Sequence, residues 1–248
     1  MATPPANLDD LTFSEADFRP LGDGASKNPE FNDARLATKR KLGDMAKGAV
    51  ARLKASGLEL EQRTSLHNPH QFNGNRVGRM WAYLVRPKKE KARLKKTLGA
   101  DLAKDLDQAY KNAYLCLAIE SDALEVSLRI HVDAWYDGQN MKRRYDGGGQ
   151  AELLGVLNAL PGFRLRLDNW KGEWICGQLT RESLGEFFQF YKPGEHSLAV
   201  DFRWPAPEGN REFALGAGVP AEMVRALEGL EDLYRWAAWS KESEFLFG

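Results

Sequence analysis

Basic residues are the most conspicuous chemical feature of this 248-residue chain, because they gather in one segment of it. Residues 35–96 contain 17 Lys and Arg against 4 Asp and Glu, a surplus of 13 that the rest of the chain cancels to a net charge of zero. Lys and Arg neutralise nucleic-acid phosphates, and Asn, Gln and aromatic side chains contact bases. The pattern favours a binding protein that engages an anionic partner, with nucleic acid as the leading candidate.

The candidate contact residues lie in one short stretch of that segment. Phosphate contacts are assigned to Arg76, Arg79, Lys88, Lys89, Lys91, Arg93, Lys95 and Lys96, and base contacts to Asn73, Asn75 and Trp81. The alternative is a solvated basic helix that the acidic C-terminal half neutralises, for example through Glu222, Glu228, Glu231 and Asp232. Only a fold that segregates the charges produces a basic surface, so folding decides between the two.

A loop rich in Asn and Gly, residues 66–76, holds two of the four histidines, His67 and His70. Histidines at this spacing can ligate a metal or supply a general base near neutral pH. The loop contains no carboxylate, so a metal would need a ligand from elsewhere, and we assign no metal site. A turn stabilised by Asn side chains explains the composition equally well.

An enzyme is the competing hypothesis, and it uses the polar face of a hairpin predicted over residues 114–133. Alternation along its second strand places Glu125, Arg129 and His131 on one side. A tight turn sets Glu120 opposite Glu125, and opposed carboxylates raise the pKa of one of them. The candidate catalytic residues are therefore Glu120, Glu125, Arg129 and His131, for a reaction that the sequence does not specify. Cross-strand ion pairs on a solvent face produce the same pattern.

A structural or protein-interaction module is the third hypothesis, and the aromatic C-terminal tail is its candidate surface. The residues concerned either bind a partner or pack into the core, and we favour packing: Trp236, Trp239, Phe245, Leu246 and Phe247. The P-loop, nucleophile-elbow and zinc-protease motifs are absent from the sequence, so we assign no cofactor.

The elements that must position these residues alternate between hairpins and covering helices. Helices are predicted at 29–56, 88–110 (with a break near Gly99), 135–145, 150–160, 181–191 and 220–240, and strands at 58–66, 79–86, 114–120, 124–133, 163–168, 173–179 and 197–204. Strands that come as hairpins favour an α+β fold with a central, largely antiparallel sheet and helices packed mainly on one face. Residues 1–28 are predicted to be a loosely ordered arm before a single domain, 29–248, whose two similar halves meet near 147–149.

Three features of the sequence indicate where in the cell the protein is found. No run approaches the ~18 apolar residues of a membrane-spanning helix, and the N-terminus lacks the basic and apolar regions of a secretory signal. Cys116 and Cys176 fall in apolar, strand-like runs and are expected to be buried free thiols. We therefore expect a cytoplasmic protein with no membrane association, and the sequence leaves its oligomeric state open.

Overall fold

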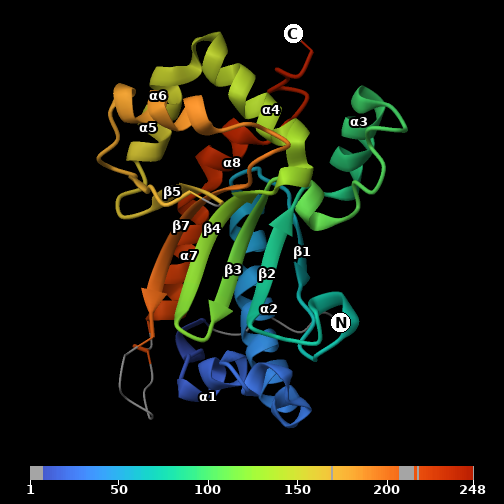
Figure 1. Ribbon diagram of the computed structural model, residues 1–248, viewed down its shortest axis with the longest axis vertical. Coiled ribbons are helices and arrows are strands. Elements are labelled where there is room, and N and C mark those ends of the chain that lie inside the picture. The colour runs from blue at the N-terminus through green and yellow to red at the C-terminus, as the bar shows by residue number, and fades with distance from the viewer. Residues whose placement is uncertain (1–7, 169, 207–214, 217, 248) are drawn as a thin grey trace. The chain divides into compact units, whose positions relative to one another are not determined.

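The computed structural model describes residues 8–168, 170–206, 215–216 and 218–247. Among them it contains seven strands and eight α-helices (Figure 1). The strands are β1 (Glu61–Thr64), β2 (Arg79–Val85), β3 (Tyr114–Glu120), β4 (Ala123–Ile130), β5 (Arg164–Leu167), β6 (Trp174–Ile175) and β7 (Leu198–Pro205). The helices are α1 (Glu15–Phe18), α2 (Asn32–Ala55), α3 (Lys88–Leu98), α4 (Trp135–Arg144), α5 (Gln150–Asn158), α6 (Arg181–Phe190), α7 (Val219–Gly229) and α8 (Glu231–Ala237).

All seven strands belong to one antiparallel sheet, in the order β1-β2-β3-β4-β7-β5-β6. The register of β5 is fixed on both sides, because Arg164 faces Ile175 of β6 and Asp201 of β7. The predicted α+β fold with an antiparallel sheet is confirmed. Both cysteines are buried free thiols, as the apolar runs around them predicted.

The chain forms two compact units that interleave along the sequence. Unit 1 comprises residues 1–84, 116–126 and 203–228, and unit 2 comprises residues 85–115, 127–202 and 229–248. Residues 147–149 lie inside unit 2, so the division into units does not follow the two halves suggested by the sequence. Strands β2, β3, β4 and β7 each contribute residues to both units.

The core of unit 1 forms around α2, which packs on β1 and on the chain that precedes it. We predicted a loose arm over residues 1–28. Residues 8–31 instead form short helical turns, whereas residues 1–7 lie outside the described part of the chain. Phe13, Phe18 and Leu21 are buried in these turns and give them an apolar anchor.

Two cations of the basic segment hold these turns in place. Arg35 is fully buried, and its guanidinium donates to the main-chain oxygens of Pro20, Ala25 and Asn28 at 2.7–3.1 Å. Lys41 Nζ lies 2.8 Å from both carboxylate oxygens of Asp17. Part of the positive charge counted in residues 35–96 therefore forms hydrogen bonds and an ion pair within unit 1 and is not available to a partner molecule.

In unit 2, α8 packs on α4 and α5, and α5 packs on α6. A second apolar cluster joins α3 to the C-terminal segment, and it contains Leu94, Leu98, Tyr136, Trp239 and Leu246. Because Leu94 and Leu98 anchor one side of α3 in this cluster, the residues on the opposite side of the helix point outward.

A buried ion pair fixes this part of unit 2. The Arg86 guanidinium donates to Asp137 Oδ1 and to the main-chain oxygen of Trp239, the latter at 3.0 Å. Asp137 also accepts the main-chain N–H of Trp239 at 2.8 Å and that of Ala113 at 2.7 Å. Asp137 has no solvent exposure and Arg86 only 4%, so this single carboxylate joins the end of β2, the start of β3, α4 and the tail.

The C-terminal tail packs into unit 2, as we favoured. Trp236, Trp239 and Leu246 are buried, and the main-chain N–H of Phe245 donates to Asn140 Oδ1 at 2.8 Å. The Phe247 ring, in contrast, is exposed.

Truncation after Ser240 is expected to lower the free energy of unfolding by about 2–3 kcal/mol, because it removes the buried Leu246 side chain and leaves Asn140 without its main-chain partner. Urea unfolding followed by tryptophan fluorescence measures this. Removal of residues 247–248 alone is the control, expected within about 0.5 kcal/mol of the full chain. Equal unfolding midpoints for the long truncation and the full chain would contradict the packing described here.

Some elements differ from their predicted bounds. The helix expected over 220–240 is two helices, since α7 ends at Gly229 and α8 begins at Glu231, and glycine commonly marks such an end. The strand expected at 58–66 is the shorter β1, residues 61–64, and the strand expected at 173–179 is the shorter β6, residues 174–175. Among the described residues, no helix is long and apolar enough to cross a bilayer.

Candidate functional site

Helix α3 has the densest positive charge among the elements of the structure. Its eleven residues, KKEKARLKKTL, include six Lys or Arg and a single carboxylate, Glu90. Pro87 precedes it with extended backbone, and Gly99 ends it at φ 83°, a conformation that favours glycine. Pro87 and Gly99 therefore mark the two ends of the helix in the sequence.

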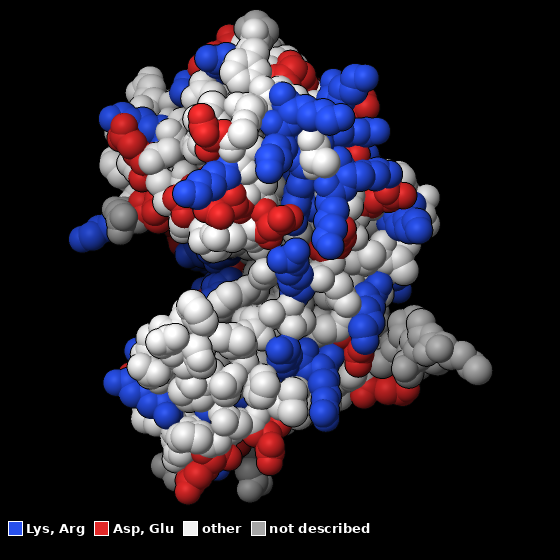
Figure 2. Space-filling model, turned by 90° about the vertical axis from the view of Figure 1, so that its right-hand side faces the viewer, with Lys and Arg blue, Asp and Glu red and all other residues white. Residues whose placement is uncertain are grey.

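The helix period divides these charges between two faces. Lys91, Leu94 and Leu98 are buried, at the three- and four-residue spacing of one helix side. Four lysines are exposed: Lys88, Lys89, Lys95 and Lys96. We call these four residues the α3 lysine face. Figure 2 shows Lys and Arg side chains gathered on the side of the molecule where α3 lies, with fewer Asp and Glu between them.

The remaining phosphate-contact candidates are placed differently. Arg93 is exposed, and its Nη1 donates to Glu90 Oε1 at 2.8 Å. Lys91 is only 4% exposed, so its ammonium group does not lie on the outer face. In unit 1, Arg76 donates to Asp23 Oδ1 at 2.7 Å, and Arg79 lies among carboxylates. The structure thus brings four of the eight candidates together as an exposed lysine cluster.

The loop with His67 and His70 is held together by its own side chains. Asn73 accepts the His70 main-chain N–H at 2.8 Å and donates to the main-chain oxygen of Asn68 at 2.9 Å. His70 Nδ1 accepts the N–H of Phe72, and the two rings stack with centroids 5.1 Å apart. These contacts agree with the alternative prediction, a turn that Asn side chains stabilise. Phe72 is 83% exposed in this turn.

The electrostatic surroundings of His67 disfavour its charged form. Burial, and then the positive charges of Lys39, Arg35 and Arg40, lower the pKa of His67 below its usual value. His67 is therefore neutral at pH 7. Among the described residues, no group of three or more His, Cys, Asp or Glu is arranged to hold a metal ion.

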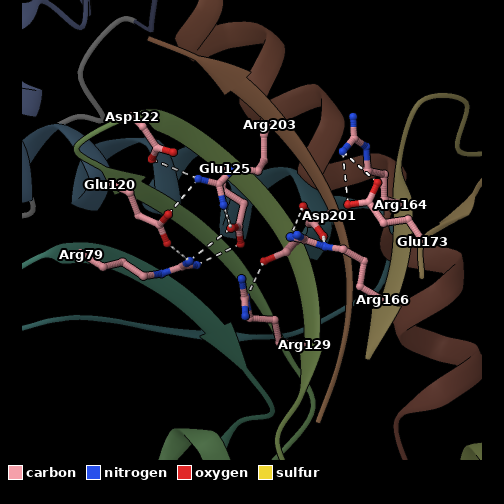
Figure 3. Close-up of polar contacts among 11 residues, drawn as sticks. Arg79, Glu120, Asp122, Glu125, Arg129, Arg164, Arg166, Glu173, Asp201 and Arg203 are labelled. Carbon is pink, nitrogen blue, oxygen red and sulfur yellow. Dashed lines mark hydrogen bonds and ion pairs between the residues drawn. The ribbon is translucent and has the colours of Figure 1, made fainter. Parts of the chain in front are cut away.

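The polar hairpin face contains an arginine–carboxylate cluster in unit 1 (Figure 3). Arg79 of β2 donates to both oxygens of Glu125 on β4, at 2.9 and 3.1 Å, and to Glu120 of β3 at 2.5 Å. Arg203 of β7 donates to Glu120 at 2.7 Å and to Asp122 in the hairpin turn at 3.2 Å, and it lies 3.5 Å from Glu125. Two guanidinium groups therefore join four strands through three carboxylates.

This geometry changes the proton chemistry expected of the two opposed glutamates. Burial alone would raise the pKa of Glu120, but the charges and hydrogen bonds of Arg79 and Arg203 outweigh it and lower that pKa below its ordinary value. The raised pKa expected from opposed carboxylates therefore does not occur at Glu120. Burial lowers the pKa of Arg79, and the negative charge of Cys116 in its ionised form, together with the Glu125 and Glu120 carboxylates, raises that pKa by more. Both groups are charged at neutral pH.

The other two catalytic candidates belong to unit 2. Arg129 Nε donates to Ser127 Oγ at 3.1 Å. His131 Nδ1 accepts the N–H of Asp133 at 3.2 Å, and its ring packs edge-on against Tyr110 with centroids 5.4 Å apart. Glu120 and Glu125 belong to unit 1, so the four residues are divided between the units.

Sequence reasoning missed several of the charged residues that organise the sheet. Arg203 and Asp201 alternate with Val200 and Phe202 along β7, which is the pattern that singled out the polar face of β4. The same alternation in β7 therefore predicts that Asp201 and Arg203 lie on its polar face. Nothing local to either strand indicates that Arg203 pairs with Glu120, because 83 residues separate them.

The fold and these sites define an α+β protein with a solvent-exposed basic helix and a charged sheet face. Its sequence contains no recognisable catalytic motif. No protein-family model matches the chain, and no curated protein matches it. Its function is therefore inferred from the site itself.

Proposed function

We propose that this protein binds nucleic acid through the α3 lysine face. The observation that supports it most directly is that Lys88, Lys89, Lys95 and Lys96 are all exposed on one short helix. The only carboxylate of that helix, Glu90, already accepts a hydrogen bond from Arg93. Such a face attracts a polyanion locally even though the whole chain is neutral.

The dimensions of the helix suit a phosphate backbone. Eleven residues at about 1.5 Å each make α3 about 16 Å long, which corresponds to roughly five phosphates along one strand at about 3.4 Å spacing. Lysine ammonium groups bind phosphates as point charges and do not distinguish bases. The proposed binding is therefore independent of sequence and sensitive to salt.

The proposal is limited to phosphate contacts. The side-chain amide of Asn73 is used within its own loop. Trp81 is half-buried on β2, where its main-chain N–H donates to Ser65 Oγ at 3.1 Å. Base contacts from Asn73, Asn75 and Trp81 stay a prediction of the sequence.

Replacing the four lysines of the α3 lysine face by Gln is expected to abolish or strongly weaken binding to duplex DNA and to single-stranded RNA at low salt, because it removes the proposed phosphate contacts. Fluorescence anisotropy with labelled oligonucleotides measures the affinity. The matched control replaces four exposed lysines elsewhere, Lys27, Lys54, Lys192 and Lys241, by Gln and changes the net charge equally. Equal affinity loss in both variants, or no binding by the unaltered protein, would contradict the proposal.

A further inference from the structure

A second feature of unit 2 has the properties of a small-molecule site. A pocket of about 250 Å³ is lined by residues of β4, β5 and β7 and by the segment between β5 and β6. Its lining contains three cations and two carboxylates: Arg129, Arg166, Lys171, Asp168 and Glu173. Leu167, Leu198, Ala199, Ser197 and Trp170 complete the walls.

The guanidinium of Arg166 is fixed in the pocket by a buried partner. Its Nε and Nη2 each lie 2.7 Å from one oxygen of Asp201, whose side chain is 1% exposed (Figure 3). A guanidinium has five N–H donors, so this bidentate pair orients the group and uses only two of them. The other N–H groups can donate to an anion, and little entropy is lost because the side chain is already ordered.

The negative charges of the lining are engaged by groups of the protein. Glu173 accepts a hydrogen bond from Arg164 at 3.0 Å, and Asp168 Oδ1 accepts the main-chain N–H of Ser197 at 2.7 Å. Arg129 and Lys171 add positive charge beside Arg166. Two arginines converging on one pocket favour a phosphate or carboxylate, which they bind bidentately.

An indole forms the aromatic wall. Trp170 is 45% exposed although it packs on Phe190, with ring centroids 4.3 Å apart. A Cβ at Gly172 would lie 2.7 Å from Trp170 Nε1, so a larger residue there would displace the indole from its present position. An indole that packs on Phe190 and is still half-exposed can stack on a planar base.

The pocket walls are fixed before any ligand binds. The Asp168 N–H donates to the main-chain oxygen of Ser197 at 3.0 Å, and Ser197 Oγ accepts the N–H of Val132 at 3.0 Å. These bonds join the end of β5, the approach to β7 and the chain after β4. We infer that this pocket binds a nucleoside monophosphate, with the phosphate on Arg129, Arg166 and Lys171 and the base against Trp170.

The size of the pocket limits the ligand. Sites for drug-sized molecules have volumes of about 300–1,000 Å³, so a pocket near 250 Å³ admits one nucleotide unit. The inference uses none of the four α3 lysines, and the α3 Gln variant is therefore expected to keep its affinity for the nucleotide. Loss of nucleic-acid binding with intact nucleotide binding would separate the two sites.

Calorimetric titration with AMP and UMP tests this inference, with adenosine, ribose 5-phosphate and inorganic phosphate as partial ligands. AMP and UMP are expected to bind, and each partial ligand is expected to bind at least roughly tenfold more weakly, because it lacks either the charged or the stacking contact. The NMR signal of the Trp170 indole N–H, identified by its absence in Trp170→Phe, is expected to move on adding AMP.

Two variants locate the phosphate. Arg129→Gln and Lys171→Gln are expected to weaken AMP binding, whereas Lys241→Gln, an exposed lysine elsewhere, leaves it unchanged. Arg129 is half-buried, so Lys171→Gln, whose side chain is exposed, decides the outcome if Arg129→Gln does not fold. An unmoved Trp170 signal in millimolar AMP, equal affinity of Lys171→Gln and the unaltered protein, or a partial ligand that binds as tightly as AMP would overturn the inference.

Discussion

Asp137→Ala is expected to lower the free energy of unfolding by about 3–5 kcal/mol, because it leaves the Arg86 guanidinium buried without its counter-charge. Asp137 is fully buried, and it also accepts the main-chain N–H groups of Trp239 and Ala113. Those two donors lose their acceptor in the variant as well, which adds to the loss. Urea unfolding monitored by tryptophan fluorescence measures the change.

Asp133→Ala is the matched control, since Asp133 lies four residues earlier in the chain and is exposed. Its contact with His131 is long and exposed, with Oδ2 at 3.5 Å from Nδ1. We expect it within about 0.5 kcal/mol of the unaltered protein. The double variant Arg86→Met with Asp137→Leu removes both charges and is expected to recover only part of the stability, since the two main-chain donors stay unsatisfied. A change below about 1 kcal/mol in Asp137→Ala would refute the role assigned to the pair.

Glu125→Gln is expected to destabilise the protein by about 3 kcal/mol, the lower end of the range for a broken buried pair. Glu125 is 1% exposed and accepts two hydrogen bonds from Arg79, and Arg203 lies nearby. Gln keeps the shape and loses the charge, so two guanidinium groups are left with less compensation. The loss is limited because Arg79 and Arg203 both keep Glu120.

The control for this variant is Asp23→Asn, which breaks the ion pair with Arg76 in the same unit. Asp23 is 94% exposed, and exposed pairs contribute between about 0 and 1 kcal/mol. Chemical denaturation of both variants side by side is sufficient. If Glu125→Gln were as mild as Asp23→Asn, the cluster would not be a stabilising network.

The antiparallel sheet is predictable because apolar and polar residues alternate along its strands, even in β4, where the polar residues Glu125 and Ser127 are also buried. Leu124, Val126 and Leu128 alternate with Glu125 and Ser127, and β4 forms there. The helical turns of residues 8–28 are not predictable from a period, because the few apolar residues there are spread over short, irregularly spaced turns. Phe13 and Phe18 are buried all the same, against a helix that follows them in the chain.

Only part of the candidate site could be read from local patterns. The eight phosphate-contact candidates do not share one surface. Lys91 lies on the same helix face as Leu94 and Leu98, and that period predicts its burial. The pairing of Arg79 with carboxylates cannot be predicted from helix or strand periods. Its partners Glu120 and Glu125 lie 41 and 46 residues away, so only the order of the strands brings them together.

The salt dependence of nucleic-acid binding tests the central proposal most directly. Each phosphate contact contributes about 0.9 to the slope of log affinity against log salt concentration on duplex DNA. We predict that the Gln variant of Lys88, Lys89, Lys95 and Lys96 has a slope shallower than that of the unaltered protein by about 3.6, and that the matched control keeps the original slope. Identical slopes for all three proteins would contradict nucleic-acid binding through α3.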